Sequence, residues 1–227
     1  MNALHKLDNP AWFALAETHA KFAVGNAIVK RYQPHVVAFA AYDYTATKAG
    51  SFFDEWITGN ESFFLIGNVP ALPANYEIKK VYPCWQMVCT TAIIIPPTVD
   101  IIKLEQKDET AMYDLVNLVQ PGFYKPGTRL MGDYYGVFQE GQLVAMAGER
   151  ICMNEYTEIS AVVTHPNYTG RQYAQQLIAK VANKNRGQGI TPILHVAQTN
   201  TRAIKLYEYL GFVTRSSINF TKIKRLQ

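Results

Sequence analysis

Hydrophobic and polar positions divide the chain into an irregular first part and a regular second part. Apolar residues recur at mostly helical spacing over residues 10–31, which predicts a helix. We expect a further helix at about 48–57, and apolar runs predict strands at 35–41, 63–69 and 76–91. Pro96 and Pro97 then mark a boundary, because a double proline ends strands and stiffens a connection. We therefore predict an N-terminal α/β domain over 1–97 and a second domain over 98–227.

The second part alternates strands and helices. The predicted elements are a strand at 99–106, a helix at 108–119, a Pro- and Gly-rich loop at 121–132, a hairpin of 134–138 with 143–151, a strand at 158–164, a helix at 170–185, a strand at 193–196, a helix at 200–210, and a closing strand or pair at 213–223. Glu140 and Gly141 supply the hairpin turn. This order predicts an α/β fold with a mixed sheet.

Composition and charge restrict the function without fixing it. The 227 residues are 48% hydrophobic and carry a net charge of +4, which suits a globular protein and an anionic small ligand rather than nucleic acid. The three cysteines have no metal-binding or disulfide spacing, so we expect a reduced, cytoplasmic protein without a metal. The uncharged stretch 81–99 contains Pro83 and the double proline, which indicates buried strands rather than a membrane span.

Two short stretches carry candidate chemistry. In "THPNYTGRQYAQQLIAK" a strand ends at Pro166, and Gly170 lets a ligand approach the backbone before a helix begins. The free amides and the dipole of that helix could bind an anion, with Arg171 adding charge, although an ordinary strand-to-helix turn has the same pattern. "NTRAIKLYEYLGF" is a helix with Asn200 as its N-cap and Gly211 at its end. Taken alone, Asn200 is only a cap and Tyr207 only a packing residue.

Together the two stretches resemble the GNAT superfamily of acyl-CoA-dependent N-acyltransferases, specifically its FR47-like branch, over residues 101–215. The most specific stretches are "LVAMAGERI", "YTEISAVVTHPNYTGRQYA" and "LHVAQTNTRAIKLYEYLGF". The resemblance implies a mixed, mostly antiparallel sheet flanked by helices, and transfer of an acyl group, in the first place acetyl, from acetyl-CoA to a primary amine by direct attack. The N-terminal domain could then be a degenerate GNAT-like half that walls the acceptor pocket or mediates dimerisation.

The resemblance also assigns roles to residues. It implies that Ala161, Val162 and Val163 offer backbone groups to the pantetheine arm, and that Asn200 bonds the cofactor nearby. It places the pyrophosphate on the amides of a turn, and the leaving thiolate beside Tyr207 as its acid. The turn comprises Thr169, Gly170, Arg171, Gln172, Tyr173 and Ala174. The architecture is similar to that of glycine N-acyltransferase-like proteins, which implies a small amino acid or another small primary amine as acceptor. We expect the protein to be a monomer or a homodimer.

Two positions depart from the family pattern. The family has a basic residue where Thr169 stands and a Gly or Ala where Gln172 stands. These departures leave open an alternative function, a non-catalytic acyl-CoA-binding sensor or interaction module with a degenerate GNAT fold.

Amine attack also needs a base, because most amines are protonated at neutral pH. Glu158 is the first candidate and Glu149 the second; either could instead be a strand-end carboxylate paired with Arg150 or a lysine. Cys152 lacks a neighbouring activating histidine and is expected to be an inert packing residue.

Overall fold

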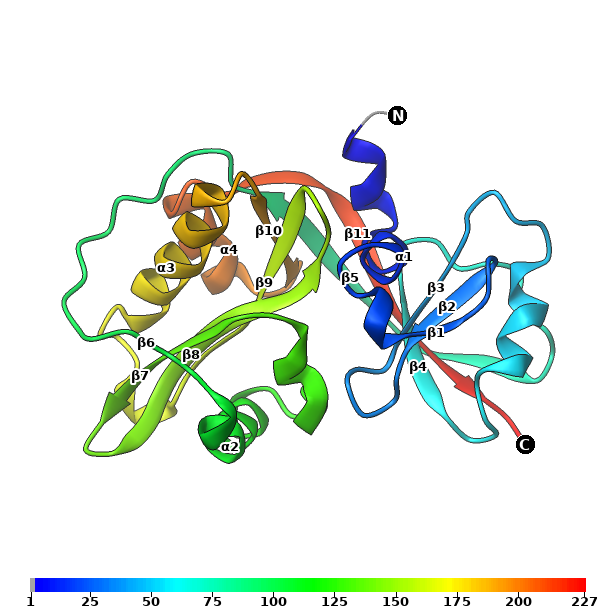
Figure 1. Cartoon of the computed structure of the whole chain (residues 1–227), viewed down its shortest axis with the longest axis horizontal. Helices are drawn as coiled ribbons and strands as arrows, with labels where there is room; N and C mark the ends of the chain where they lie inside the picture. Colours follow the sequence, from blue (N-terminus) through cyan, green and yellow to red (C-terminus); the bar gives the residue numbers. More distant parts are fainter. Residues whose placement is uncertain (1–2) are drawn as a thin grey trace.

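The strands of the protein form one continuous sheet. The computed structural model describes residues 3–227, and the sheet has eleven strands in the order β1-β2-β3-β4-β11-β5-β10-β9-β8-β7-β6 (Figure 1). Their bounds are β1 Ala23–Gly25, β2 Val29–Tyr32, β3 Phe39–Tyr42, β4 Ser62–Ile66, β5 Tyr76–Val88, β6 Ile102–Lys103, β7 Tyr134–Gln139, β8 Gln142–Cys152, β9 Tyr156–Thr164, β10 Thr191–Ala197 and β11 Val213–Arg225. Among these, β3–β4 and β9–β10 are parallel pairs and the remaining pairs are antiparallel. The predicted mixed, mostly antiparallel sheet is confirmed.

Strands β5 and β11 join the two halves of the molecule. They pair along almost their whole length, from Tyr76 opposite Arg225 to Val88 opposite Val213, and cross the centre of the view in Figure 1. The other edge of β5 pairs with β10, and the other edge of β11 pairs with β4. Strand β5, from the predicted N-terminal domain, therefore lies between β11 and β10, which belong to the predicted C-terminal domain. The hydrogen-bonded sheet runs through both halves without a break.

Within residues 3–227, four α-helices cover the sheet: α1 Pro10–Ala16, α2 Glu109–Val119, α3 Tyr173–Gly187 and α4 Thr201–Tyr209. Helices α2 and α3 lie on opposite faces of β8, because Met146 packs with residues of α2 while its neighbours Ala145 and Ala147 pack with residues of α3. Helix α4 joins the cluster of α3 through Ile204 and Leu206. Helix α1 covers the first half of the sheet. Short 3-10 turns complete the fold: η1 Ala3–Asp8, η2 Ala20–Phe22, η3 Ala49–Glu55, η4 Gln106–Asp108, η5 Pro126–Met131 and η6 Pro166–Tyr168.

The segment after β5 is extended and docks on α3. The side chain of Gln176 accepts from the Thr98 amide at 2.7 Å and donates to the Thr98 hydroxyl at 2.9 Å. Asn183 bonds both backbone groups of Ile93 in the same way, at 3.0 and 2.8 Å. Side chains of α3 therefore satisfy backbone groups of this extended segment. The predicted strand at 99–106 is present only as the two residues of β6.

The predicted helix over residues 10–31 is wrong beyond Ala16. Residues 23–32 form the hairpin of β1 and β2, whose turn is fixed by Asn26: its side chain accepts from the amides of Ile28 at 2.8 Å and Val29 at 2.9 Å. This local bonding competes with the helix that the apolar spacing predicts. The predicted helix at 48–57 is the 3-10 segment η3, and the predicted strand at 35–41 begins only at Phe39.

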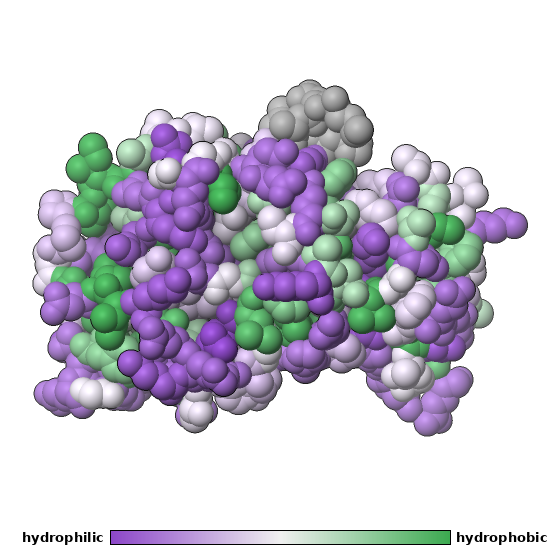
Figure 2. All heavy atoms as spheres, in the orientation of Figure 1, coloured by the Kyte–Doolittle hydropathy of each residue, from purple (hydrophilic) through white to green (hydrophobic). Residues whose placement is uncertain are grey.

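The surface in the orientation of Figure 1 is mostly hydrophilic, with hydrophobic residues in small separate patches (Figure 2). Within the described residues, no helix is long and apolar enough to cross a membrane.

Candidate active site

Strand β9 carries a bulge where the sequence places the pantetheine arm. Gly148 of β8 faces Ser160, whereas Met146 faces Val163, so an extra residue is inserted, and Ala161 has the left-handed φ of 50°. On its other edge β9 pairs with β10 only as far as Glu158 opposite Ile193. Among the described residues, that edge of 159–164 has no strand partner, so its backbone groups can pair with an extended ligand.

The turn before α3 has the geometry of an anion site. The side chains of residues 169–172 are exposed, and both Gly170 and Gln172 adopt left-handed φ values of 81° and 61°. Gln172 is the N-cap residue of the 15-residue α3 and gives it no side-chain cap bond, so the first helical amides remain available. A left-handed backbone at position 172 also explains why Gly suits that position in the GNAT turn. The Arg171 guanidinium lies 4.9 Å from the centre of the Tyr168 ring.

Asn200 is the N-cap of helix α4, and Tyr207 lies within that helix. The Asn200 side-chain oxygen caps the helix by accepting from the Ala203 amide at 3.1 Å, which leaves its NH₂ group for another partner. Tyr207 lies on the half-buried face and packs edge-on against Phe212, with ring centres 6.0 Å apart. Burial raises the pKa of Tyr207 to about 12, so its hydroxyl stays protonated at neutral pH.

A cavity of about 330 Å³ opens beside the bulge. Ala161, Val162 and Tyr207 line it, together with five further aromatic side chains. Both halves of the chain contribute, because the aromatic residues are Tyr82, Phe123, Tyr124, Tyr134 and Phe220. Gly148 allows the Tyr134 ring to lie flat on β8, since a Cβ at that position would come within 2.2 Å of it. The cavity has the size of a small-molecule site.

Glu158 lies behind this cavity in a buried polar network. Its two carboxylate oxygens accept from Arg150 Nε at 2.9 Å and Nη2 at 2.7 Å, and His195 Nδ1 lies 2.8 Å from the second oxygen. Burial acts to raise the pKa of Glu158, but the charge and hydrogen bonds of Arg150, together with His195, outweigh it and lower the pKa to about 2. The side chain is 1% exposed and does not line the cavity.

The network continues from His195 to the N-terminal segment. Gln86 donates to the Leu7 carbonyl at 2.8 Å and its oxygen accepts from Arg215 at 2.7 Å, so its NH₂ group faces His195 Nε2 at 2.9 Å. His195 Nε2 must therefore accept, which places the imidazole hydrogen on Nδ1, where it is donated to Glu158. Both ring nitrogens are engaged inside the protein.

Glu149, the second candidate base, faces away from the cavity. It is 4% exposed, accepts from Lys184 Nζ at 2.8 Å, and its other oxygen accepts from the Asp133 amide at 2.8 Å. Its position on β8 next to Arg150 explains the difference, because successive side chains of a strand point to opposite faces.

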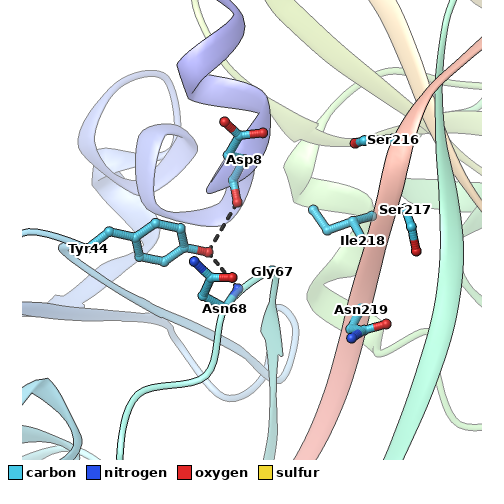
Figure 3. A pocket seen from close by; sticks show the side chains of 8 residues that line it. All are labelled: Asp8, Tyr44, Gly67, Asn68, Ser216, Ser217, Ile218 and Asn219. Atoms are coloured by element: carbon cyan, nitrogen blue, oxygen red, sulfur yellow. Dashed lines mark hydrogen bonds between the residues drawn. The ribbon is translucent and has the colours of Figure 1, made fainter.

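Other candidates have structural surroundings. Burial raises the pKa of Cys152 to about 12, as expected for an inert packing residue. The described residues contain no His, Cys, Asp or Glu cluster suited to a metal. A second, polar cavity of about 350 Å³ lies between Asp8, Tyr44 and the Ser216–Asn219 segment of β11 (Figure 3). It is separate from the bulge in β9 and from Tyr207, so we assign the reaction to the aromatic cavity.

Sequence reasoning missed most of the cavity wall. Tyr82, Tyr124 and Phe220 come from three distant segments without a motif, and Arg150 was considered only as a partner of a carboxylate. The available signal was its place in the stretch "LVAMAGERI", which forms β8, the strand that pairs directly with β9.

The sheet opens between β9 and β10, and an exposed turn follows β9 before α3 begins. The family model described as FR47-like protein matches residues 134–221. A protein of Novosphingobium aromaticivorans assigned to the GNAT family of acetyltransferases is 31% identical, with a TM-score of 0.88 over 98% of this chain and 100% of that one. The chain therefore belongs to the GNAT family.

More distant structures share the fold alone. A GCN5-related N-acetyltransferase-like protein from Streptococcus suis is 15% identical, with a TM-score of 0.59 over 98% of this chain and 97% of that one. A GCN5-related N-acetyltransferase from Kribbella flavida is 13% identical, with a TM-score of 0.57 over 99% and 95% of the two chains. No curated protein matches the sequence.

Proposed function

We propose that this protein transfers an acyl group, in the first place acetyl, from acyl-CoA to the primary amine of a small molecule by direct attack. The observation that carries the proposal is the convergence of the open edge of β9, the bulge at Ala161 and the Tyr207 side chain on one cavity. Family membership supports acyl transfer in general, and the cavity supports a small acceptor.

In the proposed complex, the amides of residues 169–174 hold the pyrophosphate and residues 161–163 hold the pantetheine. Two features of the chain fit such a ligand: the exposed left-handed turn before α3 and the unpaired edge of β9. Arg171 adds a positive charge at the turn, and the NH₂ group of Asn200 bonds the arm. Thr169 supplies no charge, so the backbone carries more of the phosphate binding than in a turn with a basic residue there.

The proposed chemistry forms an N–C bond and breaks the thioester C–S bond. The amine nitrogen attacks the thioester carbonyl carbon, the sulfur leaves as thiolate, and Tyr207 gives it a proton. Backbone amides near the bulge meet the charge that develops on the carbonyl oxygen. The amine loses its own proton when it bonds.

Glu158, the first candidate base in the sequence, is poorly suited to accept the amine proton. A carboxylate with a pKa of about 2 is a weak base, because each pKa unit below that of the donor costs about 1.4 kcal/mol in proton transfer. We propose that Glu158 contributes by holding Arg150 and His195 in place, and that water carries the amine proton away. Glu149, bonded to Lys184 on the opposite face, stays a structural residue in this scheme.

The test is turnover. A screen of small primary amines with acetyl-CoA, followed by free thiol release and by detection of the amide product, should find an acceptor. Calorimetric titration should independently show acetyl-CoA binding.

The alternative is an acyl-CoA-binding sensor that lacks turnover. One observation favours it: both candidate carboxylates are fully engaged and lie outside the cavity lining. Acetyl-CoA binding without transfer to any amine in the screen would support the sensor; the absence of binding would reject both functions.

A further inference from the structure

The acceptor cavity has one charged side chain in its wall, that of Arg150, among the residues the structure describes. No Asp or Glu lines it there, so a substrate ammonium group would find no carboxylate of the protein to pair with. The carboxylate that neutralises Arg150, Glu158, lies behind the wall. The cavity is therefore suited to an uncharged amine nitrogen and to a group that accepts hydrogen bonds from a guanidinium.

Arg150 has donors to spare. A guanidinium has five N–H groups, and two of the Arg150 donors reach Glu158, through Nε and Nη2. No other acceptor for this guanidinium is found among the described residues, and its side chain remains 13% exposed. The group lies over two aromatic rings, with its central carbon 5.1 Å from the Phe39 ring centre and 5.7 Å from that of Phe220. These contacts fix its plane without using its remaining N–H groups.

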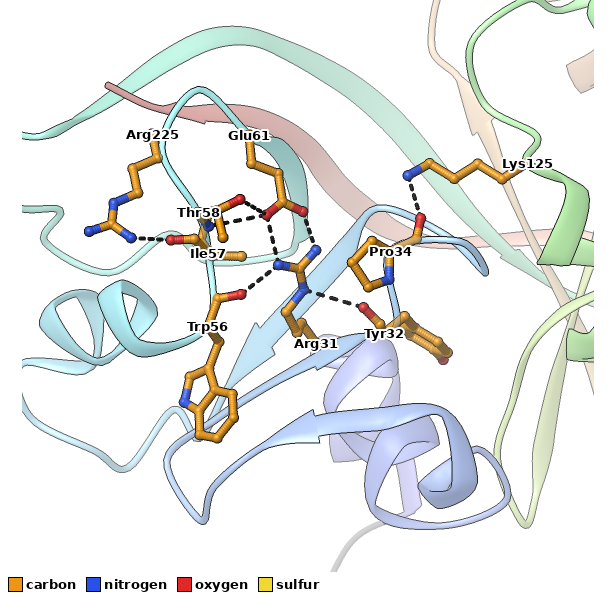
Figure 4. Close-up of polar contacts among 9 residues, drawn as sticks. All are labelled: Arg31, Tyr32, Pro34, Trp56, Ile57, Thr58, Glu61, Lys125 and Arg225. Atoms are coloured by element: carbon orange, nitrogen blue, oxygen red, sulfur yellow. Dashed lines mark hydrogen bonds and ion pairs between the residues drawn. The ribbon is translucent and has the colours of Figure 1, made fainter. Parts of the chain in front are cut away.

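A second buried arginine, Arg31, is a comparison in which every guanidinium nitrogen has a hydrogen-bond acceptor in the protein. Arg31, 4% exposed, donates from Nε to the Tyr32 carbonyl at 3.3 Å, from Nη1 to the Trp56 carbonyl at 2.6 Å, and from both terminal nitrogens to Glu61 (Figure 4). All three of its nitrogens bond within the protein, and it is not among the residues that line the acceptor cavity. Arg150 differs in having Nη1 without a protein acceptor and a cavity in front of it.

Four aromatic side chains favour an acceptor with an apolar body: Tyr82, Phe123, Tyr134 and Phe220 line the same cavity as Arg150. The lining also includes the polar side chains of Gln120, Thr128 and Ser160, and Tyr124 adds a buried hydroxyl without a hydrogen-bond partner among the described residues. A volume of about 330 Å³ has room for one ring-sized side chain beside the acetyl group.

From these contacts we propose that the acceptor is an amino acid with an apolar, preferably aromatic, side chain, and that Arg150 binds its carboxylate. The proposal rests on the transferase function above and makes Arg150 the residue that determines acceptor specificity. A carboxylate accepts two parallel bonds from a guanidinium, which a neutral amine of the same shape cannot do. Glu158 acts through Arg150 as a positioning residue.

The experiment compares each acceptor with its decarboxylated counterpart: phenylalanine with phenethylamine, tyrosine with tyramine, and leucine with isopentylamine. The unmodified protein should show a kcat/KM at least about tenfold higher for the amino acid, which corresponds to about 1.4 kcal/mol. In Arg150→Lys, which keeps the charge but not the planar fork, this preference should fall at least tenfold, mainly through KM. The charge-balanced double variant Arg150→Gln/Glu158→Gln serves if the lysine variant fails to fold.

The control is Lys107→Gln, which removes one exposed positive charge outside the cavity lining and should leave the preference unchanged. A binding measurement tests the carboxylate-binding role of Arg150 separately from the transferase function. N-acetylphenylalanine should bind the CoA complex more tightly than N-acetylphenethylamine does, and Arg150→Lys should remove the difference.

Three outcomes decide. Equal or better use of the decarboxylated amines by the unmodified protein, or a preference that survives in both Arg150 variants, overturns the role of Arg150 while the transferase function stands. Acetyl-CoA binding with no turnover of any amine rejects the transferase function, and equal binding of the two N-acetyl compounds then rejects the carboxylate site as well.

Discussion

At the residue scale, the Tyr207 hydroxyl is placed to act in the transition state and contributes little to ground-state binding. We expect Tyr207→Phe to lower kcat by about a hundredfold, the lower end of what one general acid supplies, and to leave the acetyl-CoA dissociation constant nearly unchanged. Steady-state kinetics and calorimetry measure the two quantities. Tyr209→Phe is the matched control, because that tyrosine is on the same helix but 71% exposed. Full turnover by Tyr207→Phe would remove this residue from the mechanism.

Glu158 should leave a signature in stability against pH. Its carboxyl has a folded-state pKa of about 2 against an ordinary value of 4.5, so ionisation stabilises the folded state at pH values above about 4.5, and this contribution is lost as pH falls toward 2. Glu158→Gln should therefore lower Tm most above pH 4.5, and its difference from the unmodified protein should narrow at lower pH. Thermal melts across this range test it, with exposed Glu208→Gln as control. A constant difference at all pH values would show that the ion pair is not its cause.

At the scale of elements, a glycine with a left-handed backbone lies close to each end of α3, Gly170 before it and Gly189 after it. Gly170 and Gly189 both have left-handed φ values, 81° and 76°, and a Cβ on either would meet no atom within 4 Å. Valine at either position should thus cost similar stability, about 1–2 kcal/mol, through backbone strain. Only Gly170→Val should weaken acetyl-CoA binding, by about tenfold or more, because it distorts the turn that presents the amides. Calorimetry and melts separate the effects; equal affinities for the two variants would move the phosphate site elsewhere.

Gln172 tests whether a side chain obstructs the same turn. Because its φ is 61°, Gln172→Gly should raise stability by about 1 kcal/mol by relieving left-handed strain. We expect acetyl-CoA affinity to change less than about tenfold, since the backbone amide and not the exposed side chain faces the anion. Glu140→Gly, at a hairpin tip with φ of 50°, controls for the stability gain. A larger gain in affinity would identify Gln172 as an obstruction.

At the scale of the whole molecule, the shared sheet should make the two halves unfold together. Fragment 98–227 lacks β5, which pairs with both β10 and β11 in the intact chain. We expect this fragment to show no cooperative unfolding transition and the whole chain to show one, because two buried strand edges would lose their partner. Calorimetry on both tests this. A nick at Pro96–Pro97 in the folded protein, which leaves the β5–β11 ladder intact, should preserve the transition. A fragment that melts cooperatively and binds acetyl-CoA would instead support an independent C-terminal domain.

The sequence by itself determined the elements whose signals are local. The strand at 156–164, the turn at Gly170, helix α3 and helix α4 with its Asn200 cap were predicted within a few residues, because turn chemistry, caps and apolar periodicity act over short distances. The hairpin of β1 and β2 was missed where Asn26 bonds locally against the helical spacing.

Only the tertiary structure decided what faces the cavity. Strand alternation and distant pairing turned Glu149 toward Lys184, buried Glu158 against Arg150 and His195, and brought Tyr82 and Phe220 to the wall. In the sequence, Arg150 or a lysine was a possible partner of either carboxylate, and only the structure shows that Arg150 and His195 are the partners of Glu158. Those partners set its pKa, because burial and a neighbouring guanidinium act through space between residues far apart in the chain.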